Sequence, residues 1–263
     1  MESKLKNKMK TAVILCGGRG TRLGSLGRKI PKALVKVQKK EILWYIINIL
    51  KNYNFNYFIF PLGYKGSLIR NYLKNNSYFS TNVDCLDTGL DSSIGKRIAM
   101  IEKKIKSKNF LLLNGDAIFN FNIEKIFKNH EKKKMGITFL SSEIIYQYGT
   151  VGVLNNKVVD FKRNIVYDAI KTRSLPKYTA YNYTGMSIIK TDLIRKYKKN
   201  YMNTKNFEQS FFPRLIKKTP SKLIKTKGFW HSIDNLKDLF IVDQKKINPK
   251  KFNQIKKIKK FLK

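Results

Sequence analysis

The sequence predicts an α/β fold, in which a doubly wound, mostly parallel sheet is followed by a smaller α+β half. Residues 10–140 carry this prediction through two observations. Short apolar runs, typical of strands buried on both faces, alternate with longer segments whose apolar residues repeat at helical spacing. This alternation indicates a parallel sheet, because each parallel connection needs a crossover, which is usually a helix. The length of 263 residues suits one large domain of this class.

The first half of the chain contains the expected strands and helices in regular order. Strands are expected at residues 11–16, 56–61, 83–86, 110–114 and 136–140. Helices are expected at residues 41–52, 94–106 and 123–134, with a further helix that follows Gly66 and ends near residue 74. Each strand is short and rich in Ile, Val, Leu or Phe, and each helix places apolar residues on one side.

After Ser141 the pattern becomes one of short paired strands. Residues 151–154 and 157–161 predict a hairpin with an Asn155-Asn156 turn, and residues 164–183 are expected to be loop-like. A strand is then expected at 184–189, helices at 191–199 and 207–218 with Pro213 as a potential kink, and a strand at 222–226. No internal repeat or linker-like stretch divides the chain, so we expect one domain over residues 1–243 and a Lys-rich tail over residues 244–263.

The composition is strongly basic, with 55 Lys and Arg against 17 Asp and Glu and a formal net charge of +38. A nucleic-acid partner is one interpretation of such a charge. However, only nine of the basic residues are Arg, the residue that binds phosphates and bases as a bidentate fork, and the Lys residues are spread over the whole chain. We therefore expect a solvated Lys-rich surface and no specific nucleic-acid site.

Cysteine content and hydropathy limit the cellular setting. Cys16 and Cys85 are too few for a disulfide framework or a cysteine-based metal cluster. No apolar run reaches the roughly 20 residues of a membrane-spanning helix, and the first ten residues lack the apolar core of a signal peptide. A cytoplasmic protein is the resulting expectation.

A Gly-rich turn follows the first expected strand, in the segment Leu15-Cys-Gly-Gly-Arg-Gly-Thr-Arg-Leu23. Glycines allow backbone N–H groups to approach phosphate oxygens, and Arg22 adds a cationic fork. The spacing excludes two well-known phosphate-binding motifs. Leu23 stands where the dinucleotide fingerprint needs its third glycine, and the Gly-Lys-Ser/Thr of a P-loop is absent. The alternative reading of the turn is an ordinary tight exit from a strand.

Residues 15–23, followed by Pro31-Lys32-Ala33-Leu34, resemble the G-G-x-G-T-R-L and P-K-P signature of sugar-1-phosphate nucleotidylyltransferases. Further segments agree in order, namely residues 43–46, 63–66, 87–89, 115–116 and 228–234. Most of these look like glucose-1-phosphate cytidylyltransferases, whereas residues 148–154 and 114–116 look equally like heptose-1-phosphate guanylyltransferases. The resemblance covers about residues 10–240. It implies a Rossmann-like mixed sheet of the nucleotide-diphospho-sugar transferase type, with a nucleotide-binding half at about 10–140 and a sugar-phosphate half at about 141–243.

The resemblance also implies roles for individual residues. Nucleotide binding is assigned to Gly17, Gly18, Gly20, Thr21, Arg22, Thr88, Gly89 and Asp116. Arg22 would hold the outgoing phosphates and Lys32 the α-phosphate, where negative charge builds during transfer. Asp116 and Asp234 would hold Mg²⁺, a cation that prefers oxygen ligands. The alternative role for an isolated Asp at a strand end is that of a helix cap.

On the sugar side, Lys162 and Gly185 match the family positions, but the surrounding residues depart from the pattern. Phe161-Lys162-Arg163 lacks the Glu and Pro that usually flank the lysine, and Thr184 replaces a glycine. The acceptor therefore need not be glucose 1-phosphate. The expected reaction is nucleotidyl transfer from a nucleoside triphosphate, with CTP favoured, to a sugar 1-phosphate, giving a nucleotide sugar and pyrophosphate. The open alternatives are a heptose-1-phosphate guanylyltransferase using GTP and a non-catalytic nucleotide-sugar-binding relative. A homo-oligomer is also open.

Overall fold

The computed structural model describes residues 9–76, 82–146, 148–167 and 169–243. The tail expected at residues 244–263 lies outside this part of the chain, and the division into halves near residue 140 stays a prediction. None of the helices in the described ranges combines the length and apolarity that a membrane span requires.

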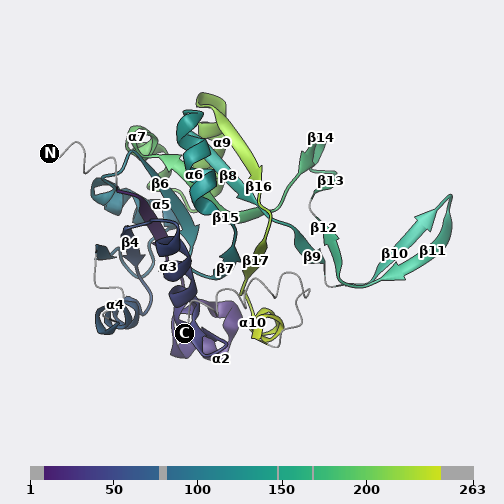
Figure 1. Cartoon of the computed structure of the whole chain (residues 1–263), viewed down its shortest axis with the longest axis horizontal. Coiled ribbons are helices and arrows are strands. Elements are labelled where there is room, and N and C mark those ends of the chain that lie inside the picture. Colours follow the sequence, from purple (N-terminus) through teal and green to yellow (C-terminus); the bar gives the residue numbers. More distant parts are fainter. Residues whose placement is uncertain (1–8, 77–81, 147, 168, 244–263) are drawn as a thin grey trace.

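A seven-stranded mixed sheet forms the centre of the molecule, in the order β16-β8-β15-β6-β1-β4-β5 (Figure 1). Its strands are β1 (Thr11–Leu15), β4 (Tyr57–Leu62), β5 (Val83–Asp87), β6 (Asn109–Asn114), β8 (Ile137–Ser141), β15 (Tyr183–Lys190) and β16 (Ser221–Lys225). Strand β15 runs antiparallel to both neighbours, whereas the other pairs are parallel. The expected α/β class with a mostly parallel sheet is thus confirmed.

Helices cover both faces of this sheet, as the doubly wound prediction requires. One face packs against α3 (Ile42–Asn52), α4 (Gly66–Asn75) and α6 (Ile123–Lys132). The other packs against α5 (Ile94–Ile101), α7 (Thr191–Lys196), α8 (Lys198–Tyr201) and α9 (Phe207–Lys218). Successive residues of β1 divide between the faces: Ala12 and Ile14 belong to the first core, and Val13 to the second.

Two expected helices differ from what their sequence pattern indicates. The helix expected at 94–106 ends at Ile101 and continues as a 3₁₀ turn, Glu102–Lys104. There the Glu102 carboxylate pairs with Arg195 of α7 at 3.4 Å and Lys198 of α8 at 3.2 Å, which ties this turn to the two helices. The helix expected at 191–199 divides into α7 and α8 at Tyr197. Pro213 lies inside α9, which continues through it to Lys218.

Several short elements that the sequence pattern did not predict surround the end of the sheet. They are the 3₁₀ turns Thr21–Leu23 and Lys32–Leu34, α2 (Ser25–Lys29), β2 (Lys36–Val37), β3 (Lys40–Glu41), β7 (Ala117–Asn120), β17 (Phe229–Ser232) and α10 (Leu236–Asp243). Strands β7 and β17 pair with each other and lie outside the central sheet.

Between β8 and β15 the chain forms three two-stranded ribbons, which we call the arm (residues 144–180). They pair β9 (Ile144–Tyr146) with β12 (Ile165–Tyr167), β10 (Thr150–Leu154) with β11 (Lys157–Lys162), and β13 (Ile170–Thr172) with β14 (Leu175–Ala180). Figure 1 shows the β10–β11 ribbon projecting from the body. The predicted hairpin is confirmed, and both turn asparagines have positive φ. The expectation of a loop at 164–183 is wrong, because strands this short show too few residues for a recognisable alternation.

Candidate active site

The Gly-rich turn opens the site at the carboxyl end of β1. Gly20 has a φ of 62°, a conformation that favours glycine, and the following 3₁₀ turn begins there. Nothing lies within 4 Å of the position that a Cβ of Gly18 would take, so this backbone faces open space. Arg22 extends from the turn with 78% of its side chain exposed. The turn therefore presents accessible backbone groups and the largely exposed Arg22 guanidinium to a ligand.

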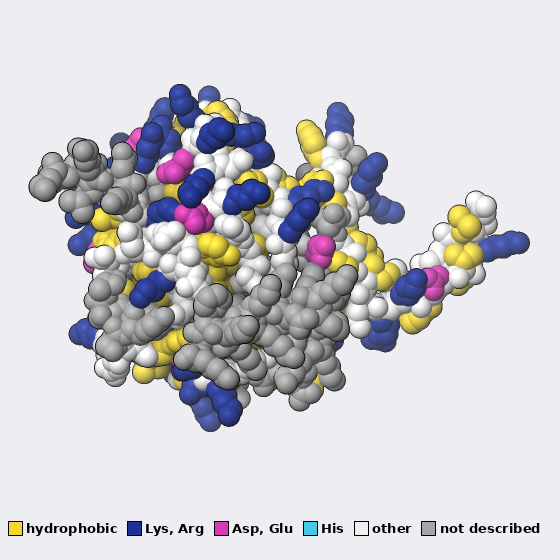
Figure 2. All heavy atoms as spheres, in the orientation of Figure 1, with side chains coloured by type: hydrophobic (Ala, Val, Ile, Leu, Met, Phe, Trp, Pro, Cys, Tyr) yellow, Lys and Arg dark blue, Asp and Glu magenta, His cyan; other side chains and the backbone are white. Residues whose placement is uncertain are grey.

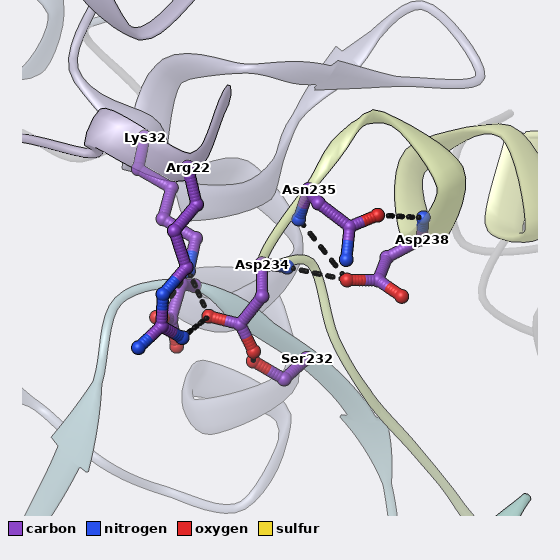
Figure 3. Close-up of polar contacts among 7 residues, drawn as sticks. Arg22, Lys32, Ser232, Asp234, Asn235 and Asp238 are labelled. Carbon is purple, nitrogen blue, oxygen red and sulfur yellow. Dashed lines mark hydrogen bonds and ion pairs between the residues drawn. The ribbon is translucent and has the colours of Figure 1, made fainter. Parts of the chain in front are cut away.

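The Lys32 ammonium lies between two carboxylates that are far apart in the sequence. Its Nζ donates to Asp116 Oδ2 at 2.7 Å and to Asp234 Oδ1 at 2.8 Å. Arg22 Nη1 lies 3.5 Å from the same Asp234 oxygen, and Figure 3 shows both cationic side chains converging on it. Only 16% of the Lys32 side chain is exposed. The site thus combines two cations with two anions at one point.

Backbone pairing explains how Asp234 reaches Asp116. Strand β6 ends at Asn114, and Asp116 follows immediately before β7. The register of β7 and β17 sets Ala117 opposite Ser232, and the Ile233 amide donates to the Asp116 carbonyl at 2.9 Å. Asp234 is the next residue, so the ribbon brings the two carboxylates together.

Local hydrogen bonds hold the Asp234 segment in place. The Ser232 hydroxyl donates to Asp234 Oδ2 at 2.9 Å, and Asp238 Oδ2 accepts from the backbone amides of Asp234 and Asn235 (Figure 3). Burial would raise the pKa of Asp234, but the hydrogen bond and charge of Lys32, together with Ser232 and Arg22, outweigh it and lower that pKa. Asp234 is therefore held as a carboxylate.

Asp116 and Asp234 fit a Mg²⁺ site in which the protein supplies two carboxylates and a bound substrate supplies further oxygen ligands. Their oxygens already converge on one cationic atom, Lys32 Nζ. Within the described residues no group of three or more His, Cys, Asp or Glu gathers that could hold a metal alone. Mg²⁺ usually takes only one or two protein carboxylates and completes its shell with water and substrate phosphates. The donor set here matches that mode.

The Gly-rich turn, Lys32 and the two carboxylates line one cavity at the carboxyl edge of the sheet. Of the predicted site residues, the lining includes Gly18, Gly20, Thr21, Arg22, Lys32, Asp116 and Asp234. Cys16 also lines it, and burial, followed by the nearby Asp116 charge, raises the pKa of this thiol. Cys16 is thus a neutral thiol beside the carboxylates, an unsuitable nucleophile.

Arg97 is a residue of this region that sequence analysis did not identify. Its buried guanidinium donates to the Gly17 carbonyl at 3.2 Å, the Leu62 carbonyl at 2.9 Å, Thr88 Oγ1 at 2.7 Å and the Leu90 carbonyl at 3.2 Å. Burial lowers the Arg97 pKa, and the charges of Asp87 and Asp91 oppose this effect. The guanidinium thereby joins the Gly-rich turn to the ends of β4 and β5. Helical spacing gave no signal for this role.

Arg97 contacts two predicted nucleotide-binding residues, Gly17 and Thr88, and a third, Gly89, follows Thr88 in the chain. The Gly17 carbonyl accepts hydrogen bonds from the Arg97 guanidinium and from the Tyr64 amide, each at 3.2 Å. Thr88 is buried, and its hydroxyl donates to the Leu62 carbonyl at 2.6 Å. Gly89, at a φ of 87°, follows it in the turn after β5. Their contact with a nucleotide stays a prediction.

The two predicted sugar-phosphate residues lie in different places. Gly185 in β15, at a φ of 72°, packs so closely on Asn114 that a Cβ there would lie 2.5 Å from Asn114 Nδ2. It is therefore near the strand end that leads to Asp116. Lys162 lies in the arm at the end of β11, exposed, and pairs with Asp160 at 2.8 Å. The structure does not bring Lys162 into the cavity lining, and its role stays a prediction.

Comparison with known proteins finds relatives that cover much of the chain. The chain is 29% identical over 253 residues to a probable glucose-1-phosphate cytidylyltransferase of Bacillus subtilis, covering 89% of this chain and 94% of that protein. It is 29% identical over 153 residues to the D-glycero-alpha-D-manno-heptose 1-phosphate guanylyltransferase of Aneurinibacillus thermoaerophilus, covering 57% of this chain and 66% of that protein.

Solved structures share the fold. HddC from Yersinia pseudotuberculosis matches with a TM-score of 0.66 at 22% identity, over 90% of this chain and 99% of that one, and it is also known in complex with GMP-PN. Residues 11–248 match the protein family described as nucleotidyl transferase. This match spans most of the sequence and includes every residue of the cavity, so the chain belongs to the nucleotidyl transferase family.

Proposed function

We propose that this protein transfers the nucleotidyl group of a nucleoside triphosphate to a sugar 1-phosphate. The observation that carries the proposal is the Lys32 ammonium held between Asp116 and Asp234 at the exit of the Gly-rich turn. Such an arrangement suits phosphoryl-type transfer, which requires positioning and neutralisation of charge more than a protein nucleophile. The names of the relatives add the substrate class.

In the proposed reaction, a phosphate oxygen of the sugar 1-phosphate attacks the α-phosphorus of the nucleotide. The new oxygen–phosphorus bond forms as the bond to the bridging oxygen of the β-phosphate breaks, and pyrophosphate leaves with that bonding pair. Lys32 would neutralise the charge that develops on the α-phosphate. The largely exposed Arg22 would hold the outgoing phosphates. Its guanidinium lies near Asp234, the carboxylate that also pairs with Lys32.

Asp116 and Asp234 would hold Mg²⁺, which when bound polarises the phosphates and neutralises their charge. Because both carboxylates also pair with Lys32, the ion would share its ligands with the catalytic ammonium. The charges of Mg²⁺ and the Lys32 ammonium together exceed those of Asp116 and Asp234, which would leave a net positive charge for an incoming triphosphate. Arg97 would keep the Gly-rich turn in shape behind the nucleotide.

We favour CTP as the nucleotide and glucose 1-phosphate as a first acceptor to test, on the evidence of the cytidylyltransferase relatives. A heptose 1-phosphate with GTP is the second candidate, favoured by two guanylyltransferase relatives at 29% identity. Lys162 and Gly185 would face the acceptor. A non-catalytic nucleotide-sugar-binding role is the alternative that the assay below distinguishes.

The decisive experiment is a matrix of four nucleoside triphosphates against several sugar 1-phosphates, read by pyrophosphate release in the presence of Mg²⁺. We expect release with one preferred pair and its loss in Lys32→Ala. A matched control is Lys36→Ala, since Lys36 is exposed and pairs with Glu41 outside the cavity. Nucleotide binding without release for any pair would contradict the enzymatic proposal and favour the non-catalytic one.

A further inference from the structure

Lys65 differs from most of the lysines that give this chain its charge. Figure 2 shows Lys and Arg side chains spread over the visible face, and most lysines in the described ranges are exposed. Lys65 is half-buried, and its ammonium donates to the backbone carbonyl of Arg28 and to that of Lys29, the latter at 2.8 Å. Those two residues end α2, so Lys65 reaches from the start of α4 to the carboxyl end of another helix.

Helix α2 has few contacts of its own to keep it in place. It is five residues long, too short to be stable alone, and only Gly27 among them is buried. The last carbonyls of a helix have no donors within the helix, and a cation near that end interacts favourably with the helix dipole. Lys65 supplies both the hydrogen-bond donors and the charge.

The position of α2 matters because this helix joins two segments that line the cavity. Arg22 lies shortly before α2, and Lys32 follows its last residue by three positions. Gly27 packs directly on the carbonyl oxygen of Gly20, so that a Cβ at Gly27 would overlap this oxygen. Gly20 begins the 3₁₀ turn that carries Arg22. A shift of α2 would therefore displace this turn and the chain that leads to Lys32.

Tyr64, next to Lys65, holds the same part of the chain at its other end. The Tyr64 amide donates to the Gly17 carbonyl at 3.2 Å, and the Arg19 guanidinium lies 5.7 Å from the centre of the Tyr64 ring. Tyr64 and Lys65 thus contact the chain on both sides of Arg22, at the Gly-rich turn and at the end of α2.

The backbone conformation of Lys65 gives no reason for a lysine at this position. Its φ of 51° lies in the left-handed region, which favours glycine and asparagine. Either of these residues would adopt the conformation more easily than lysine, but the side chain of neither is long enough to replace the ammonium at the α2 carbonyls. The contacts with α2 are therefore what the lysine adds.

We propose that Lys65 is a positioning residue for nucleotidyl transfer, which sets the place of Arg22 and Lys32 by holding the end of α2. Lys65 is not among the residues that line the cavity, so it would act without touching the substrate. The catalytic consequence rests on the function proposed above, whereas the hold on α2 does not.

Lys65→Asn tests the catalytic consequence, because asparagine suits both the left-handed conformation and the N-cap of α4 but lacks the ammonium. We expect the melting temperature to stay near that of wild type. The kcat for pyrophosphate release should fall about tenfold or more, since small displacements of catalytic groups slow the reaction strongly. Lys65→Arg keeps a cationic donor of similar reach and should recover most of the lost turnover.

Lys134→Asn is the matched control. Lys134 is also a lysine with a φ of 51°, but it is exposed, follows α6 and lies outside the cavity lining. Its replacement should leave turnover unchanged. An equal loss of turnover in both asparagine variants, or wild-type turnover in Lys65→Asn, would overturn the proposal.

Hydrogen exchange measures the hold on α2 without any substrate. The amides of Arg28 and Ile30 donate to the carbonyls of Gly24 and Leu26, at 3.3 Å and 3.0 Å. In Lys65→Asn these amides should exchange about tenfold faster or more, whereas those of the central sheet should not change. Unchanged exchange at α2, or equally faster exchange throughout the protein, would overturn the proposal. If wild type released no pyrophosphate with any substrate pair, the proposed function would fail, and the exchange comparison would still decide whether Lys65 holds α2.

Discussion

Replacing Gly17 by alanine tests whether the buried Arg97 guanidinium fixes the Gly-rich turn. A Cβ at position 17 would lie 2.5 Å from Arg97 Cζ, 2.7 Å from Nη1 and 2.8 Å from Nε. At Gly18, the next residue, nothing lies within 4 Å of the corresponding position. Gly17→Ala and Gly18→Ala are therefore a matched pair that differ chiefly in the contact with Arg97.

The magnitude follows from the bonds that the guanidinium must give up. Carbon atoms pack at about 3.5–4.0 Å, so Arg97 must move by about 1 Å to admit the new methyl group. Such a shift takes its bonds to the Gly17 carbonyl, at 3.2 Å, and the Leu62 carbonyl, at 2.9 Å, out of hydrogen-bonding range. Loss of one or two charge-assisted bonds, at about 1.5–3 kcal/mol each, predicts that Gly17→Ala lowers the free energy of unfolding by about 2–4 kcal/mol.

The assay is equilibrium unfolding in urea, with nucleotide binding measured by calorimetry on the same variants. We expect Gly18→Ala to remain within about 1 kcal/mol of wild type and Gly17→Ala to fall clearly below it. In the Arg97→Met background, Gly17→Ala should lower the free energy of unfolding much less than it does in wild type, because the obstructing guanidinium is gone. Equal stabilities of the two glycine variants, or strictly additive effects of Gly17→Ala and Arg97→Met, would refute the reasoning.

Three further predictions concern the carboxylate site and a buried histidine. Lys32→Ala should lower kcat by about a hundredfold with a smaller effect on KM, read by pyrophosphate release, because the charge it neutralises develops in the transition state; a change confined to KM would contradict this role. Asp116→Asn should remove most turnover and leave the melting temperature near that of wild type, and near-normal activity would exclude Asp116 as a metal ligand. Burial lowers the pKa of His130 to about 4 from its ordinary 6.5, so below pH 6.5 the unfolded chain binds a proton that the folded chain does not. Stability should therefore fall by about 3 kcal/mol as the pH drops from 6.5 to 4, and a pH profile that stays as steep in His130→Gln would show that another group is responsible.

Local pattern was enough to predict the framework of the fold. The apolar runs at β1, β4 and β6 and the amphipathic repeat of α3 are properties of neighbouring residues, so they are visible in the chain itself. The ribbons at 165–180 were not predicted, because strands of three to six residues, mostly exposed, carry little apolar alternation. The ion pairs that Glu102, just after α5, makes with Arg195 and Lys198 also join residues far apart in the sequence, so no local pattern shows them.

By itself the sequence determined which residue types stand at the ends of the strands: a Gly-rich turn after β1, a lysine soon after it and two aspartates far along the chain. Only the tertiary structure decided that Lys32 lies between Asp116 and Asp234, which are 84 and 202 residues away from it. The pairing of β7 with β17 brings the two aspartates together, and Arg97 holds the Gly-rich turn through its hydrogen bond to the Gly17 carbonyl. The physical reason is that strand pairing and the buried Arg97 guanidinium join segments that are far apart along the chain. No local sequence pattern records such contacts, so their geometry exists only once the sheet has formed.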